Sequence, residues 1–180
     1  MSAAYYDVQA EQGSTFRMYL TLADKNGNAL NLKGDENGYI PVAQLPEGFE
    51  DRFLDSSGNS LAKVFVRMQV RDSVDGTVLP ITPPTDVVGF TSDSGLTLYG
   101  ISGYGTDAFP IDIQLGDGGT TQTDPNIIIT IDAIYMEGID YGKPLYDIEI
   151  VYAQDTISHP KKVVYRIQQG RFIITPNVTR

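Results

Sequence analysis

Apolar and polar residues alternate with a period of two along most of this chain, and this pattern constrains its fold more than any other feature. The alternation is clear in FRMYLTL at 16–22, VFVRMQV at 64–70 and YDIEIVY at 146–152. A period of two places successive side chains on opposite faces of a half-buried β-strand. Further strands are expected at 96–101, 111–115, 127–131 and 163–174. The stretch 127–131 is dense enough in β-branched residues for us to expect burial on both of its faces.

Turn chemistry separates these strands at regular intervals. The sequence DKNGN at 24–28 predicts a hairpin turn, and 72–76 predicts a second one. Only 131–138 competes for helix, and its length favours a single turn. Strands bounded by turn signals in this way predict an all-β fold, an antiparallel β-sandwich or small barrel. The whole chain, 1–180, is expected to be one domain, long enough to bury a core without disulfides or metals.

The closing segment reads KKVVYRIQQGRFIITPNVTR and occupies 161–180. Its alternation predicts two short strands separated by a turn or bulge at Gly170, with Phe172 and Ile174 packing the final strand. Few charges protect 172–174, so we expect this edge to be open to strand addition by a neighbouring molecule.

Long irregular stretches interrupt the strands, above all a predicted loop insertion at 33–62. Connections of more than about 12–15 residues are usually functional or held by a partner. Aromatic residues in such loops and near the chain ends combine a large contact area with a polar tip, a mixture favoured in protein interfaces. An alternative is that several of these tyrosines cap the ends of the sandwich. The predicted loop anchors for partners are Tyr5, Tyr6, Tyr39, Phe53, Tyr104 and Phe109.

The composition disfavours several classes of function. There is no cysteine and a single histidine, His159, for which a solvated loop position is the expected environment. Nucleophile and base pairs, thiolate metal sites and metal-dependent hydrolysis therefore lack their usual residues, and we expect no enzyme activity and no cofactor. A net charge of −10 disfavours nucleic-acid binding. No apolar run approaches the ~18 residues of a membrane span, so a soluble protein without a visible secretion signal is expected.

Three acidic or aromatic patterns are candidates for a calcium, carbohydrate or glycosidase site. The sequence from Asp24 begins like a calcium loop, but its sixth position is Ala29 and its twelfth is Asp35, so the hairpin turn is favoured. A carbohydrate site could use Tyr99 and Tyr104 as stacking platforms with Asp107 as a polar contact. Four carboxylates could act as glycosidase acids, but alternation predicts that they lie on solvated strand faces. These four are Asp112, Asp132, Asp147 and Glu149.

The order of several short motifs resembles a known family. These motifs are EQGSTFR at 11–17, VRMQVRD at 66–72, YDIEIV at 146–151, GRF at 170–172 and TPNVT at 175–179. Together they are similar to the small immunoglobulin-like virion structural proteins of tailed bacteriophages, including the N-terminal domain of baseplate upper proteins. The resemblance covers 1–32, 63–79 and 141–180, and it departs at the long stretch 34–62.

This resemblance implies an immunoglobulin-like β-sandwich with long loop insertions and a non-enzymatic role in the phage particle. Such a protein is made in the host cytoplasm and is located in the virion, where it bridges subunits of the tail, baseplate or neck through loops and termini. The implied partners are other virion proteins and copies of itself in a symmetric ring. Nucleic acid, membrane and small-molecule substrates are not implied. Two alternatives are a capsid decoration protein and a carbohydrate-binding β-sandwich of the host-attachment apparatus.

Overall fold

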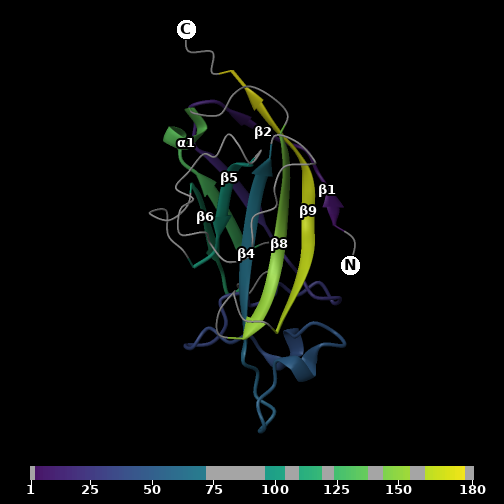
Figure 1. Ribbon diagram of the computed structural model, residues 1–180. Helices are drawn as coiled ribbons and strands as arrows, with labels where there is room; N and C mark the ends of the chain where they lie inside the picture. The colour runs from purple at the N-terminus through teal and green to yellow at the C-terminus, as the bar shows by residue number, and fades with distance from the viewer. Residues whose placement is uncertain are drawn as a thin grey trace.

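The computed structural model describes residues 3–71, 96–103, 110–118, 124–137, 144–154 and 161–176. Two β-sheets and one short helix make up most of this part of the chain (Figure 1). The strands are β1 Ala4–Tyr5, β2 Val8–Glu11, β3 Phe16–Leu20, β4 Ala62–Arg71, β5 Leu96–Ile101, β6 Ile111–Leu115, β7 Ile127–Ile131, β8 Leu145–Gln154 and β9 Lys162–Thr175. The helix α1 spans Ala133–Glu137, and the 3-10 turns η1 and η2 span Val42–Gln44 and Glu50–Arg52.

The larger sheet has the strand order β1-β9-β8-β4-β5, with β2 also paired to β9. Strands β4, β5, β8 and β9 pair with one another antiparallel, whereas β1 and β2 both run parallel to β9. The prediction of a wholly antiparallel fold is therefore wrong at this edge. The reason is that β9 is long enough for the N-terminal segment to lie beside it, and alternation carries no information on the direction of a partner far away in sequence.

The smaller sheet has the order β3-β7-β6 and is antiparallel throughout. Its central strand buries Ile127, Ile129 and Ile131, while Ile128 and Thr130 keep partial exposure. The expected burial of this strand on both faces is therefore wrong. One face of β7 packs into the core, and the other does not need a second layer because a half-buried strand tolerates β-branched residues on either side.

A hydrophobic core fills the space between the two sheets. Val66 and Met68 of β4 and Ile148 of β8 face the buried isoleucines of the smaller sheet. Burial of this apolar surface supplies the main favourable free energy of the two-layer arrangement. The predicted β-sandwich is confirmed in this coarse sense, and the predicted strands at 16–22, 64–70, 96–101, 111–115, 127–131 and 146–152 are confirmed in position. The single helical turn expected within 131–138 is also confirmed as α1.

The closing segment is one strand of 14 residues, and Gly170 pairs with Tyr146 in regular register, so the predicted strand pair with a turn or bulge at Gly170 is wrong. Gly170 lies within the strand because the main chain of Tyr6 passes so close that a Cβ at this position would collide with the Tyr6 carbonyl group. Glycine is required where two backbones approach in this way. One side of 172–174 is paired within the chain itself, since Val8–Glu11 runs beside Phe172–Thr175.

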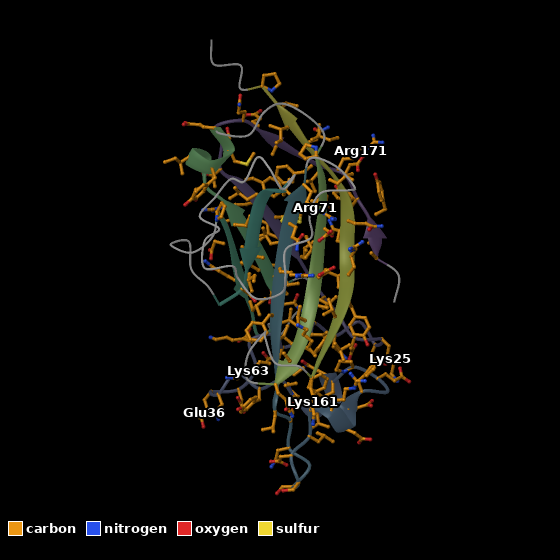
Figure 2. The ribbon with its side chains drawn as sticks, in the orientation of Figure 1. Lys25, Glu36, Lys63, Arg71, Lys161 and Arg171 are labelled. Atoms are coloured by element: carbon orange, nitrogen blue, oxygen red, sulfur yellow. The ribbon has the colours of Figure 1, made fainter. Side chains whose placement is uncertain are left out.

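Three turns of the same construction project from the stretch between β3 and β4. In each, an aspartate carboxylate accepts the backbone N–H groups of the residues two and four positions later. The aspartates are Asp24, Asp35 and Asp55, and each is followed three residues later by a glycine with φ of 86°, 82° or 81°. Figure 2 shows Lys25 and Glu36, from the first two turns, at the same end of the sandwich.

The hairpin turn predicted at 24–28 is thus confirmed, with an isolated bridge between Ala23 and Ala29 closing it. The second predicted turn, at 72–76, lies outside the described residues. The stretch 33–62 contains η1 and η2 and no strand before β4 begins at Ala62. It is held against the sandwich by Ile40 and Phe53, both of which are buried in the core.

Candidate interaction surface

A groove of about 830 Å³ runs between the N-terminal strands and β3. One wall is formed by Ala4–Gln9, the other by Phe16–Leu20, and Gln168 and Ile173 of β9 also contribute. The groove therefore lies where an edge of the larger sheet comes close to an edge of the smaller sheet.

Both walls of this groove are edge strands. In the described part of the chain β3 pairs only with β7, and β1 and β2 pair only with β9. Because successive backbone N–H and C=O groups of a strand point to opposite sides, each wall presents alternate backbone groups that no neighbouring strand in this region satisfies. Such an edge can template pairing with another chain.

Exposed aromatic side chains gather at this groove. Tyr5 and Tyr6 are each 63% exposed and Tyr19 is 58% exposed, and all three line it. Their spacing in sequence gives no hint of this grouping, because Tyr19 comes from a different sheet. Tyr19 was not among the predicted contact residues, although its polar-face position within the alternating stretch 16–22 was a signal that could have identified it.

The N-terminal wall is firmly attached to β9 and β8. The Tyr6 N–H donates a 2.9 Å hydrogen bond to the Gln169 carbonyl oxygen, and the backbone N–H of Arg171 donates to Asp7 Oδ1 at 2.8 Å. Below them Val8 and Ala10 are buried in the core. The exposed tyrosines therefore project from a fixed strand, which lowers the conformational entropy that binding would cost.

Among the described lining residues, two side chains carry charge. Asp7 is the carboxylate of this pair, and it accepts the backbone N–H of Arg171. Arg17 is exposed, and within the described residues its guanidinium takes part in no hydrogen bond or ion pair. In this part of the chain the groove thus offers a positive group without an ion-pair partner, two positions before Tyr19.

The other predicted contact residues fall in different environments. Tyr39 is half-buried, with the Lys63 ammonium 5.1 Å from its ring centroid. Phe53, Phe172 and Ile174 have side chains at most 3% exposed, so in this fold they form core and not contact surface. Tyr104 and Phe109 lie outside the described residues, as do Asp107 and His159, and the Tyr99 side chain is not described either. Among the predicted contact residues that the structure describes, the groove therefore brings together Tyr5 and Tyr6.

The expectation of solvated carboxylates on the strand faces is wrong for the larger sheet. Asp147 and Glu149 are buried, and they pair with Arg71 and Arg67, which are buried as well. The Arg67 Nε donates to Glu149 Oε2 at 2.6 Å, and Arg166 Nη2 approaches the two carboxylates at 3.7 and 3.5 Å. Alternation places these residues on one face, but it does not tell whether that face is covered.

Burial sets the electrostatics of this charged face. The pKa of Asp147 is raised because the loss of solvation outweighs the stabilising charges of Arg71 and Arg166. On the same face, both polar atoms of the Gln69 side-chain amide are buried and have no hydrogen-bond partner among the described residues. Of the other candidate acids, Asp112 on β6 accepts a hydrogen bond from Gln114, and Asp132 is exposed before α1. Two of the four acids thus lie on the larger sheet, one lies on the smaller sheet, and one lies between β7 and α1.

The turn aspartates are occupied by backbone hydrogen bonds. The pKa values of Asp24 and Asp55 are lowered, first of all by the N–H groups of Asn28 and Asn59. In the calcium-like sequence at 24–28, the Asp24 carboxylate therefore closes a turn through these hydrogen bonds. Among the described residues, no group of three or more potential ligands could hold a metal ion.

Comparison with family models, with curated proteins and with solved structures finds no match to this chain. In the part of the chain that the structure describes, every helix is too short or too polar to cross a membrane.

Proposed function

We propose that this protein is a non-enzymatic structural component of a tailed bacteriophage particle, built on an immunoglobulin-like sandwich, which bridges neighbouring subunits of the tail, baseplate or neck. The observation that carries the proposal is the groove between two edge strands, lined by Tyr5, Tyr6 and Tyr19. Its partners are other virion proteins and copies of itself arranged in a ring.

The physical character of the groove supports a binding role. Proteins that act as isolated monomers usually protect their edge strands with charges, prolines or covering loops. Among the described residues, the groove lining carries only Asp7 and Arg17 as charged residues, and three exposed tyrosine rings lie beside strand edges that no described strand pairs with. Tyrosine is enriched at protein interfaces because a rigid ring with a polar tip buries a large area at low entropic cost.

The positions of the family-like motifs in the fold add support. EQGSTFR at 11–17 forms the turn that leads into β3, and 66–71 belongs to β4. YDIEIV at 146–151 lies in β8, and 170–172 lies in β9. The resemblance therefore concerns the framework strands, and the stretch where it departs forms the end that carries the turns at Asp35 and Asp55.

Particle association tests this proposal directly. Phage particles encoding the chain would be purified by density-gradient centrifugation and analysed by quantitative mass spectrometry. We expect the chain in the particles at a fixed ratio to a tail protein, with immunogold label on the tail or baseplate. Label on the head would favour the decoration alternative, and absence of the chain from purified particles would exclude a virion role.

A further inference from the structure

We propose that the groove binds an extended segment of a partner polypeptide, which adds as a strand to the open edge of β3 and places a carboxylate on Arg17. The inference rests on the proposed function and specifies its partner: a strand-forming segment with an acidic side chain.

The edge of β3 determines how such a segment would bind. A strand added to a sheet lies about 4.8 Å from its neighbour and gains affinity from main-chain hydrogen bonds. β3 has five residues, Phe16–Leu20, so a partner segment of similar length can pair with it. The wall opposite, Ala4–Gln9, then covers the segment from the other side.

The side chains of β3 determine what the segment should contain. Arg17 and Tyr19 are both exposed, whereas Met18 between them is buried. Residues two apart in a strand share a face, and cross-strand neighbours on that face interact. A carboxylate opposite Arg17 and an apolar or aromatic side chain opposite Tyr19 therefore give the segment an acidic–x–apolar pattern.

Charge complementarity favours an acidic segment over a neutral one. The Arg17 guanidinium has no partner within the described residues. The Asp7 carboxylate, which also lines the groove, already accepts the backbone N–H of Arg171. A guanidinium forms its strongest protein hydrogen bonds with carboxylates, often through two parallel N–H donors. If a partner without a carboxylate covered Arg17, the charge of the guanidinium would be left uncompensated.

The first test selects ligands from a displayed library of random 12-residue peptides on the immobilised full-length protein. We expect enrichment of proline-poor sequences with the acidic–x–apolar pattern. For a synthetic peptide of the enriched sequence, Arg17→Gln should weaken binding about tenfold or more in fluorescence anisotropy, since a charge-assisted hydrogen bond is lost. The matched control, Arg171→Gln, removes an exposed arginine outside the groove and should leave the affinity unchanged. Both variants should keep the wild-type melting temperature.

The second test examines the backbone pairing. Two versions of the selected peptide would carry N-methyl groups on alternate amides, in the two possible registers. Strand addition predicts that one version loses binding and the other retains it, because only alternate amides face β3. Equal binding of both versions, failure to enrich any sequence, or unchanged affinity of Arg17→Gln would each overturn the proposal.

Two further outcomes separate this inference from the proposed function. Concentration-dependent dimers in sedimentation velocity that the peptide dissociates would make a second copy the occupant and overturn the assignment to a different partner. Wild-type levels of Arg17→Gln protein in purified particles would overturn this binding mode while leaving the virion role intact. Depletion of the variant, but not of Arg171→Gln, from particles is the expected result.

Discussion

The hydroxyl group of Tyr146, in the middle of the larger sheet, donates a 2.6 Å hydrogen bond to the main-chain carbonyl oxygen of Tyr6. Gln168 Nε2 donates in turn to the same hydroxyl oxygen at 2.6 Å. Burial raises the pKa of Tyr146, so its hydroxyl stays protonated and can donate. The hydrogen bond from Tyr146 to Tyr6 links the N-terminal wall of the groove to the strand β8.

Removal of that hydroxyl should loosen the N-terminal strands. Tyr146→Phe keeps the edge-to-face contact with Phe172 but leaves the Tyr6 carbonyl without its side-chain donor. We expect a loss of about 1 kcal/mol in the free energy of unfolding, with faster amide hydrogen exchange at 4–11. Urea titration and hydrogen–deuterium exchange measure the two effects. The control Tyr165→Phe should change neither, since the Tyr165 ring packs edge-on against Tyr152 and its hydroxyl makes no hydrogen bond within the described residues.

Gly170→Ala should displace the N-terminal segment. The added Cβ meets the Tyr6 backbone, which cannot rotate away as a flexible side chain would. Overpacking of this kind costs about 1–3 kcal/mol, measured by urea unfolding, and weakens peptide binding in the groove. Gly116→Ala is the matched control because its Cβ would meet neighbours at no less than 3.4 Å. Wild-type stability of Gly170→Ala would show that the two backbones are not in close contact.

Removal of one member of the buried pair Arg67 and Glu149 should lower the free energy of unfolding more than removal of both members. Glu149→Gln takes away a carboxylate that neutralises a buried guanidinium, with an expected loss of about 3–5 kcal/mol. The double variant Arg67→Met with Glu149→Leu should lose less than Glu149→Gln alone, because no buried charge is left uncompensated. Asp51→Asn, at an exposed position, is expected to stay within about 0.5 kcal/mol of wild type. A solvated face would show only small effects for all three.

Stability should fall in alkali through Tyr152. Burial raises the pKa of this tyrosine to about 12 from its ordinary value of 10.0. Between these values the folded state holds the proton more tightly than the unfolded state, so stability decreases as the pH rises from 10 towards 12, by up to about 2–3 kcal/mol. Urea unfolding at pH 9, 10 and 11 should show a shallower decline for Tyr152→Phe than for wild type. Parallel curves for the two proteins would contradict the shift.

Most strands could be located from the sequence because their signal is local. The alternation in VFVRMQV at 64–70 and YDIEIVY at 146–152 needs only the period of the β-strand, and both strands lie where it places them. Whether the polar face of these two strands is exposed or buried could not be predicted from local sequence. Arg67 and Glu149 look solvated from their sequence neighbours, yet both are buried, and the pairing of β4 with β8 places their opposite charges side by side.

The candidate site was also predicted in part. Tyr5 and Tyr6 were predicted as contact residues from their aromatic character, and the structure places both side chains, exposed, at the groove. Tyr19 could not be joined to them, since its proximity depends on two different sheets meeting at their edges. Gly170 was predicted as a turn or bulge because the sequence alone does not distinguish a glycine at a strand break from a glycine where two backbones approach closely.

Local sequence specifies where β-strands form and where turns interrupt them, because alternation and Asp-x-x-Gly turns act over a few neighbouring residues. Three features instead depend on long-range packing: the parallel direction of Val8–Glu11 beside β9, the burial of the charged face of β4 and β8, and the groove between β3 and the N-terminal strands. The sheet pairings behind these features join residues that are distant in sequence, such as Arg67 with Glu149 at a separation of 82 and Tyr6 with Tyr146 at a separation of 140. Their free energy is gained only when the two sheets close on a common core.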